Sequence, residues 1–320
     1  MPLSAELTAL ASDRRHVLFI ARGSSDNAAV YGRTLVEVHA GKLATLATPS
    51  VATAYRSRLD LDGVLAVAIS QSGATEEIVE TLDWARSCGA ATVAITNVAG
   101  SPLALTADLA MVTQAGAELA VPATKTYTTA LAALAVLGHA LAPDPVFLDA
   151  LQRTPEAATV ALDSASAAAE LAALIGPVTG MVVTGRGFTQ STALELALKL
   201  KETCYLHAIG LSYADLLHGP IAVLDEKTPA LLVAPSDGPI LPGMVALAER
   251  VREIGARPFA IGGDAALADL CVASIAGPLL PEALAPIVLA IPGQLVVEAL
   301  ARQLGLDPDS PRTLTKVTQT

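Results

Sequence analysis

The same order of buried runs, glycine-bearing loops and amphipathic stretches occurs twice along this chain of 320 residues. Each half opens with a short apolar run that ends in Arg-Gly, at 16–23 and again at 181–187. Further matched runs lie at 64–69 and 230–234, and at 92–96 and 258–262. Short β-branched runs that end near glycine predict buried strands followed by tight turns. The repeated order therefore predicts two domains of the same design.

Helical spacing after these runs predicts the fold class. The stretches 27–38 and 192–205 follow the two Arg-Gly turns and have the spacing of amphipathic helices. Strands that alternate with helices form parallel sheets covered on both faces, with ligands at the carboxyl ends of the strands. We therefore expect an α/β protein with two doubly wound, flavodoxin-like domains at 1–155 and 156–320, joined through the Pro- and Asp-rich stretch 142–156.

Composition excludes several classes of protein. The formal net charge of -11 argues against a nucleic-acid binder, because such proteins need a basic surface. Cys88, Cys204 and Cys271 are far apart without a C-x-x-C spacing, so they predict neither a zinc site nor a disulfide framework and fit a reduced cytoplasm. The first six residues lack the basic patch and apolar run of a secretory signal, so we expect a cytoplasmic protein.

The segment 271–300 is the most apolar part of the chain. A membrane helix needs about 20 predominantly apolar residues, and four prolines together with Glu282 and Glu298 interrupt this segment. We expect it to be broken repeatedly, and to form a buried helix and a subunit interface without entering a membrane.

The loop after the run 64–69 predicts an anion site. It reads Ser70-Gln71-Ser72-Gly73, and helical spacing begins at Glu76. The hydroxyls of Ser70, Ser72 and Thr75 therefore meet a helix N-terminus, which favours an anion, and Gly73 lets the backbone approach closely. A serine-rich turn can also simply cap a helix, but Gln71 and the second serine exceed what capping needs.

The matching loop of the second half, 235–238, reads Pro-Ser-Asp-Gly and carries fewer donors and a carboxylate. We therefore expect one phosphate site per chain. Neither the segment 22–25 nor 185–190 completes G-x-G-x-x-G, and no Walker lysine pattern is present. We expect no nicotinamide, no ATP, no other cofactor and no metal.

Six segments occur in the order and form of one family: Arg22 to Ser25, Ile69 to Gly73, Ala115 to Glu118 with Thr124 and Lys125, Ala193 to Glu202, His218 to Pro220, and Pro311 to Lys316. In these segments the chain resembles the tandem sugar isomerase (SIS) family. It is most similar to the isomerase portion of glucosamine-6-phosphate synthases and to the stand-alone glucosamine-6-phosphate deaminases of the SIS type. The resemblance extends from about His16 to Thr320.

The resemblance implies a binding site for a phosphorylated sugar. The phosphate contacts fall on Ser25, Ser70, Gln71, Ser72 and Thr75, and the sugar contacts on Val121 and Thr124. Ser24 also belongs to the predicted substrate site. Ala123 stands where the synthases carry a serine, so one contact to a sugar hydroxyl differs. Members of the family usually form homodimers in which a histidine reaches the neighbouring site, and we expect a homodimer here.

Three charged residues share one helical face. Glu195, Lys199 and Glu202 are spaced i, i+4 and i+7, which by itself is typical of an exposed Glu-Lys ladder. The resemblance implies instead that Glu202 is the base that moves a proton between C1 and C2 of an open-chain sugar phosphate. Lys199 would keep Glu202 ionised and belongs to the predicted substrate site.

His218 precedes Gly219-Pro220, a setting in which a histidine is ordinarily a loop or cap residue. The resemblance places it at the opening of the sugar ring, where a group that titrates near neutrality passes a proton to the ring oxygen. His207, expected at the end of the same helix as Glu202, is the reserve candidate. The other three histidines, at 16, 39 and 139, are expected to be structural.

Lys316 lies four residues from the C-terminus, where a lysine is ordinarily a solvated charge. The resemblance implies that it forms an imine with the ketose while the tail closes over the sugar, and desolvation there would lower the pKa of its amine. Arg312 is expected to anchor this tail, and Glu195 is a candidate partner.

The reaction is inferred from the start of the sequence together with these residues. The first strand begins almost directly after Met1-Pro2, so we expect no glutaminase domain and no synthesis from glutamine. The prediction is that the protein is a glucosamine-6-phosphate deaminase that forms fructose 6-phosphate and ammonia. Three alternatives stay open: a phosphosugar aldose–ketose isomerase, a deglycase for sugar-amine 6-phosphates, and a non-catalytic sugar-phosphate sensor.

Overall fold

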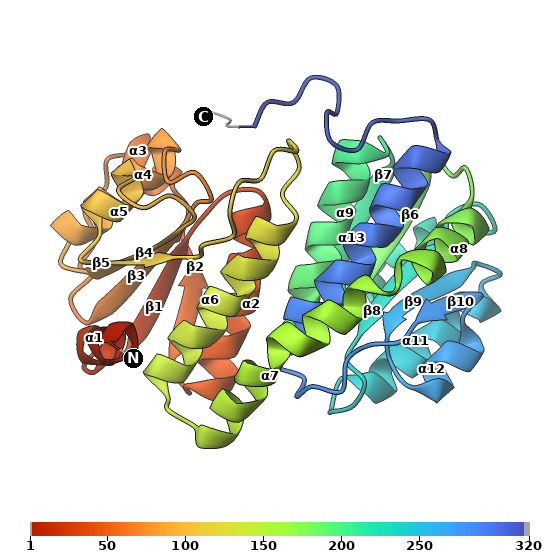
Figure 1. Ribbon diagram of the computed structural model, residues 1–320, viewed down its shortest axis with the longest axis horizontal. Coiled ribbons are helices and arrows are strands. Elements are labelled where there is room, and N and C mark those ends of the chain that lie inside the picture. Colours follow the sequence, from red (N-terminus) through yellow and green to blue (C-terminus); the bar gives the residue numbers. More distant parts are fainter. Residues whose placement is uncertain (1, 317–320) are drawn as a thin grey trace. The chain divides into compact units, whose positions relative to one another are not determined.

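The computed structural model describes residues 2–316, which fold into two compact units. Among these residues, unit 1 comprises 2–118, 123–148 and 315–316, and unit 2 comprises 119–122 and 149–314. Each unit contains one five-stranded parallel sheet flanked by helices, so the predicted fold class is confirmed (Figure 1). The domain boundary at residue 155 stays a prediction.

Unit 1 is built on strands in the order β2-β1-β3-β4-β5. Its strands are β1 (His16–Ile20), β2 (Leu43–Leu46), β3 (Val64–Ile69), β4 (Ala91–Thr96) and β5 (Leu109–Val112). The chain winds from β1 outward to β2 and then returns to the other side of β1 at β3. The winding therefore reverses between β1 and β3, and such a point is where ligands bind in open parallel sheets.

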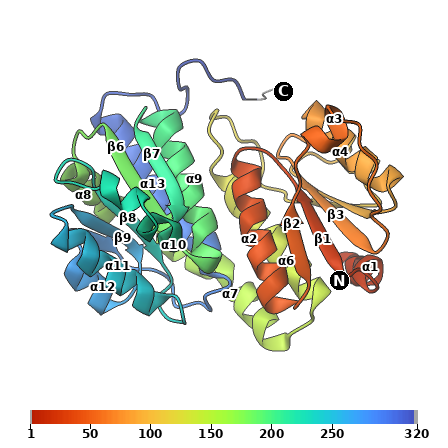
Figure 2. The same ribbon diagram turned by 180° about the vertical axis from the view of Figure 1, so that it is seen from behind.

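Helices cover both faces of this sheet. They are α1 (Pro2–Ala11), α2 (Ser24–His39), α3 (Ser50–Thr53), α4 (Glu76–Ser87), α5 (Pro102–Thr106) and α6 (Lys125–Leu141). Buried side chains of α4 and α5 pack against β3 and β4 in one cluster. On the other face α2 packs on β1 and on α6 (Figure 2). A Cβ at Gly32 would lie 2.9 Å from both Leu134 and Phe19, so glycine permits this close packing.

Unit 2 repeats the same winding, with strands in the order β10-β9-β8-β6-β7. The strands are β6 (Gly180–Gly185), β7 (His207–Ser212), β8 (Ala230–Ala234), β9 (Pro258–Gly262) and β10 (Ala273–Ile275). Its helices are α8 (Ala165–Ile175), α9 (Gln190–Thr203), α10 (Tyr213–Leu217), α11 (Leu241–Glu253), α12 (Ala265–Leu270) and α13 (Ala285–Gln303), with short 3₁₀ turns at Gly187–Thr189 and Pro220–Val223. The matched runs of the two halves thus occupy equivalent strands.

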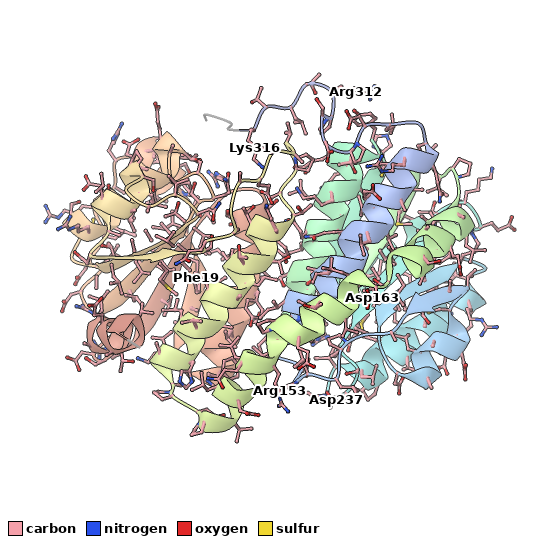
Figure 3. The ribbon with its side chains drawn as sticks, viewed as in Figure 1. Phe19, Arg153, Asp163, Asp237, Arg312 and Lys316 are labelled. Carbon is pink, nitrogen blue, oxygen red and sulfur yellow. The ribbon has the colours of Figure 1, made fainter. Side chains whose placement is uncertain are left out.

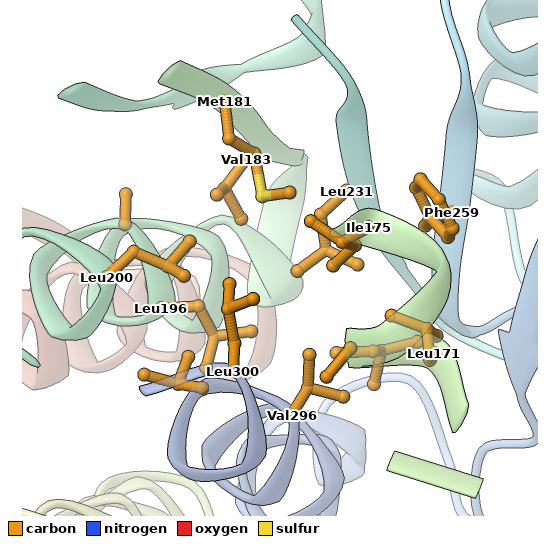
Figure 4. Packing of buried hydrophobic residues seen from close by; sticks show 14 of the residues in the cluster. Leu171, Ile175, Met181, Val183, Leu196, Leu200, Leu231, Phe259, Val296 and Leu300 are labelled. Atoms are coloured by element: carbon orange, nitrogen blue, oxygen red, sulfur yellow. The ribbon is translucent and has the colours of Figure 1, made fainter. Parts of the chain in front are cut away.

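The largest core cluster of unit 2 lies where α8, α9 and α13 meet the sheet (Figure 4). Leu196 and Leu200 of α9 pack there with Val296 and Leu300 of α13. The opposite face is covered by α10, α11 and α12. Because α9 is held between the sheet and α13, its side chains are fixed on both sides.

Helix α13 corrects one expectation. Pro278 and Pro281 interrupt the segment between β10 and α13, and the expected buried helix forms. Pro286 and Pro292 do not break that helix: Pro286 lies in its first turn, where a missing N–H costs little, and the helix continues through Pro292. Among single helices of the described residues, α13 alone is long and apolar enough to cross a membrane, and most of that apolar stretch is buried in the protein. The bent pair of α7 (Pro145–Leu162) and α8 passes the same test only if the two helices are taken as one span.

The linker stretch 142–156 is mostly helical, because α7 (Pro145–Leu162) runs through it. One further boundary differs from expectation. Helix α9 ends at Thr203, and Tyr205 adopts a left-handed conformation with φ +56°. His207 therefore begins β7 and does not lie at the end of α9, so the expectation for its position was wrong.

Candidate functional site

The predicted anion loop joins β3 to the first turn of α4. Ser70 is 6% exposed, and its hydroxyl lies 3.4 Å from that of Thr75. The Ser72 hydroxyl accepts a hydrogen bond from the backbone N–H of Ala74 at 3.2 Å. Thr75 is the N-cap of α4, yet its side chain makes no capping hydrogen bond. Simple capping therefore does not account for the Thr75 hydroxyl.

The shape of the loop depends on Gly73. Its φ of +61° is in the left-handed region, and a Cβ there would lie 2.1 Å from the Ser101 hydroxyl oxygen and 2.8 Å from that of Thr96. The Gly73 carbonyl also accepts a hydrogen bond from the N–H of Leu103 at 2.9 Å. Any side chain at this position would strain the backbone and displace its neighbours.

A pocket opens at the carboxyl ends of β1, β3 and β4, where the winding of sheet 1 reverses. Its lining residues are Ser24, Ser25, Ile69, Gln71, Ile95, Thr96, Asn97, Thr113, Ala123, Thr126, Tyr127 and Ala130. Three predicted residues are therefore brought together here: Ser24, Ser25 and Gln71. Ser70, Ser72, Thr75 and Thr124 are not among the lining residues, although the first three lie in the adjoining loop.

Asn97 is a lining residue that the sequence analysis missed. Its side-chain oxygen accepts hydrogen bonds from the Thr113 hydroxyl at 3.0 Å and the Ala115 N–H at 2.8 Å, and its amide donates to the Gly116 carbonyl at 2.8 Å. Asn97 thus holds the 113–116 segment against the end of β4. The signal was available, because a polar residue directly after a buried strand belongs to the ligand edge of a parallel sheet.

The equivalent loop of unit 2, at 235–238, differs in its polar side chains. The Ser236 hydroxyl donates to the Pro278 carbonyl at 3.1 Å, so it is used inside the fold. A Cβ at Gly238 would lie 2.5 Å from a carboxylate oxygen of Glu282, which places that acid against the loop. Burial, and then the charge of Asp237, raise the pKa of Glu282 (Asp237 is labelled in Figure 3). Two carboxylates make this loop unfavourable for a phosphate.

The three charged residues of α9 form a connected, mostly buried group. Glu195 is fully buried, and the side chain of Lys199 is 4% exposed. The Lys199 ammonium lies 3.5 Å from Glu195 Oε1 and also forms an ion pair with Glu202 Oε2. The alternative of an exposed ladder is therefore wrong for Glu195 and Lys199, since β7 and α13 both pack on α9.

The environment of Lys199 favours its charged form. Burial by itself lowers the pKa of Lys199, but the charges and hydrogen bonds of Glu195 and Glu202 outweigh it, so the pKa is raised. A charged lysine between the two carboxylates leaves the group with one net negative charge. The side chain of Glu202 is 22% exposed, so this carboxylate is the member of the group that solvent reaches.

Glu202 opens into a second pocket within unit 2, which is lined by Lys201, Glu202, Tyr205, Arg312, Thr313 and Leu314. The Arg312 N–H donates to the Tyr205 hydroxyl at 2.9 Å, and the Arg312 guanidinium stacks on the same ring at 4.1 Å. Arg312, labelled in Figure 3, therefore anchors the C-terminal segment as expected, through Tyr205. In the same unit the Val121 N–H donates to the carbonyl of Asp309, at 2.9 Å.

The two candidate histidines are both exposed. His218 caps the C-terminus of α10, and its backbone N–H donates to the Asp215 carbonyl at 3.1 Å. Gly219, with φ +129°, and Pro220 then turn the chain. His207 lies at the amino end of β7, away from the carboxyl ends where the loops gather.

Lys316 forms an ion pair with Glu118 at 3.2 Å, a contact within unit 1. The Glu118 side chain is 3% exposed and also accepts hydrogen bonds from Thr124 and Thr126. The sequence analysis did not single out Glu118 as a site residue, because its partner lies 198 residues away. Glu195, the candidate partner from sequence, is paired with Lys199.

Two observations bear on cofactors. Within residues 2–316, no group of three or more His, Cys, Asp and Glu side chains is arranged to hold a metal ion. All three cysteines are free thiols.

Comparison with known proteins gives a consistent result. A model of the SIS domain matches residues 10–140 and 178–301. The glutamine–fructose-6-phosphate aminotransferase (isomerizing) of Thermococcus kodakarensis is 37% identical over 314 residues, which cover 94% of this chain and 51% of that protein. The chain thus spans about half the length of the curated relatives it matches.

Two solved structures extend the comparison. The crystal structure of a candidate phosphosugar isomerase from Silicibacter pomeroyi is 34% identical, with a TM-score of 0.86 over 96% of this chain and 93% of that one. A glucosamine-6-phosphate deaminase from Thermotoga maritima is 21% identical, with a TM-score of 0.77 over 100% and 98% of the two chains. The second likeness is one of fold.

Proposed function

The chain belongs to the SIS domain family, and from this premise we propose that it converts glucosamine 6-phosphate and water to fructose 6-phosphate and ammonia. The observation that carries the proposal is the buried group of Glu195, Lys199 and Glu202, which keeps one partly exposed carboxylate beside a charged lysine. The likeness to a glutamine–fructose-6-phosphate aminotransferase supports a 6-phosphorylated sugar as the substrate class.

Glu202 is the proposed base. In the open-chain sugar it removes the proton from C2, and the electron pair forms the C1–C2 double bond of an enolamine as the aldehyde oxygen gains a proton. Return of the proton to C1 gives the imine at C2. The C2 imine is then hydrolysed by way of Lys316, so that ammonia leaves and the ketose forms. Lys199 supports the step because its ammonium is ion-paired with Glu202 and holds that carboxylate in place.

We propose that the phosphate is bound by the Ser70–Thr75 loop, which includes Gln71, and by Ser24 and Ser25. The loop ends at the N-terminus of α4, where N–H groups and the helix dipole favour negative charge. Neutral hydroxyl and amide donors suit a chain with a net charge of -11, because the site does not depend on a basic surface. Val121 and Thr124 are the proposed sugar contacts.

His218 and Lys316 have proposed roles on either side of the proton transfer. His218 donates a proton to the ring oxygen so that the cyclic sugar opens. The neutral Lys316 amine adds to the C2 imine and ammonia leaves, and water then hydrolyses the lysine imine to the ketose and the free amine.

A second candidate is aldose–ketose isomerisation of a neutral phosphosugar, favoured by the likeness to the candidate isomerase from Silicibacter pomeroyi. The proton transfer between C1 and C2 is the same in both reactions, but no nitrogen leaves. The two candidates therefore differ in their products.

A panel of 6-phosphorylated amino and neutral sugars, assayed for ammonia and ketose, tests the proposal. Ammonia from glucosamine 6-phosphate supports deamination, and interconversion of neutral sugars without ammonia contradicts it in favour of isomerisation. Binding without turnover of any sugar indicates a sensor.

The role of Glu202 is tested with Glu202→Gln. Loss of a general base lowers kcat about 10²- to 10⁴-fold, with sugar binding retained. Glu298→Gln is the matched control, because Glu298 pairs with Arg302 on the surface of α13. Equal activity of wild type and Glu202→Gln would exclude Glu202 as the base.

We also propose a homodimer that works in the cytoplasm. Three free cysteines suit a reducing compartment. Light scattering after size exclusion tests the assembly, and a mass of one chain across the micromolar range would contradict it.

A further inference from the structure

The carboxylate of Glu118 divides its contacts between two parts of unit 1. Oε1 accepts hydrogen bonds from the backbone N–H groups of Thr124 and Thr126, each at 3.0 Å, in the first turn of α6. Oε2 accepts from the Thr126 hydroxyl and from the Lys316 ammonium, the latter at 3.2 Å. One buried carboxylate thus joins α6 to the C-terminal segment.

We propose that Glu118 is the positioning residue for Lys316: it holds the Lys316 amine at the first turn of α6 as a protonated ion pair in the absence of substrate. The proposal rests on the role given above to Lys316 in the reaction, and it adds the group that places this lysine. Lys316 is otherwise the end of a segment without regular secondary structure.

The charge balance of the site agrees with a protonated resting lysine. Burial alone would raise the pKa of Glu118, but the hydrogen bonds from Thr126 and Thr124 and the charge of Lys316 lower it below the ordinary value. The ionised carboxylate lies 3.2 Å from the Lys316 ammonium, a distance at which the two opposite charges attract. Attack on the C2 imine needs the neutral amine, so the ammonium must first release its proton to solvent, to which 28% of the Lys316 side chain is exposed.

A purely structural role is the competing explanation. Thr124 is the N-cap of α6 and makes no side-chain capping hydrogen bond, so Glu118 also serves as the acceptor for that first turn. Glu118→Gln separates the two roles, because the amide oxygen still accepts from Thr124 and Thr126 while the negative charge is lost. Glu118→Asp keeps the charge on a shorter side chain.

The first measurement needs no substrate. Trace acetylation with acetic anhydride, followed by peptide mass spectrometry, compares the labelling of Lys316 with that of exposed Lys201 in the same sample. We expect Glu118→Gln to raise the relative labelling of Lys316 about fivefold, the order expected when a partly exposed ion pair is lost, and Glu118→Asp to stay nearer wild type. Glu253→Gln is the control, because it removes only a surface ion pair with Arg250, and it should leave the relative labelling of Lys316 unchanged. Unchanged labelling in Glu118→Gln would overturn the proposal.

The second measurement uses glucosamine 6-phosphate. Glu118→Gln should lower kcat about tenfold and reduce the borohydride-trapped adduct on Lys316, with KM within about twofold of wild type, because positioning and not binding is lost. A raised KM at unchanged kcat would also overturn the proposal. If wild type turns over no sugar, the proposed function fails, while the labelling result still decides whether Glu118 holds Lys316.

Discussion

Single residues determine the geometry of both candidate sites, and Gly73 is the sharpest case. Its positive φ could be inferred from the turn that the loop needs, but the clash with Ser101 could not, since Ser101 approaches from the turn after β4. The burial of Glu195 and Lys199 could not be inferred from the sequence either, because the same i, i+4 spacing occurs on exposed helices. The i, i+4, i+7 pattern specifies a common face and says nothing about what covers it.

Gly73→Ala should destabilise the protein and abolish phosphosugar binding. Strain at positive φ costs about 1 kcal/mol, and the clash with Ser101 adds about 1–3 kcal/mol. Gly41→Ala is the matched control, because Gly41 has the same φ of +61° with nothing within 4 Å of a Cβ. Urea denaturation measures the stability of both variants. Equal losses of stability in Gly73→Ala and Gly41→Ala would show that the clash with Ser101 is relieved at no cost.

Lys199→Met should destabilise the fold by about 3–5 kcal/mol near neutral pH, because it leaves the buried Glu195 carboxylate without its cation. Lys201→Met, on the exposed side of the same helix, should cost less than about 0.5 kcal/mol. The folded pKa of Lys199 is raised above its ordinary value of 10.5, so its contribution is complete below that pH and is lost as pH rises through the folded pKa. In alkaline solution the difference in the free energy of unfolding between wild type and Lys199→Met should therefore narrow.

At the scale of helices and strands, the sequence patterns predicted most elements correctly but misplaced some of their ends. The matched runs are all strands in the structure, and the stretch after Gly73 forms α4. These elements were predictable because hydrophobic periodicity and glycine position act over neighbouring residues. The end of α9 was misjudged, since Tyr205 turns the chain in a left-handed conformation that is rare for a non-glycine residue. Helix α13 continues through Pro292, and burial of its apolar face offsets the missing hydrogen bond.

The packing of α9 on α13 holds the charged group of Glu195, Lys199 and Glu202 in place. Leu196→Ala, in the shared core one residue after Glu195, should cost about 2–5 kcal/mol and lower kcat as well. Leu174→Ala is the control, because Leu174 is 48% exposed on α8. Thermal unfolding and steady-state kinetics measure the two effects, and a loss of stability with unchanged kcat would separate this packing from the chemistry.

At the scale of the whole molecule, the duplication produced two similar sheets with unequal loops. Within the described residues, Asp237 and Glu282 lie at the loop of the second sheet, where they disfavour an anion, while the matching loop of the first sheet carries the hydroxyls of Ser70, Ser72 and Thr75. From that asymmetry we propose a single phosphosugar per chain.

Calorimetric titration with glucosamine 6-phosphate should therefore give a stoichiometry of one per chain, abolished by Gly73→Ala and unaffected by Asp237→Asn. Two equivalent sites per chain would contradict the assignment of the second loop.

The sequence by itself determined the two parallel sheets and the loop between β3 and α4, because strand period, helix period and glycine position act over a few neighbouring residues. It also located Glu202 and Lys316 through the resemblance. Only the tertiary structure decided that Lys199 is buried between two carboxylates and that Lys316 meets Glu118. Burial depends on what packs against a helix, and a pair 198 residues apart in sequence leaves no local pattern.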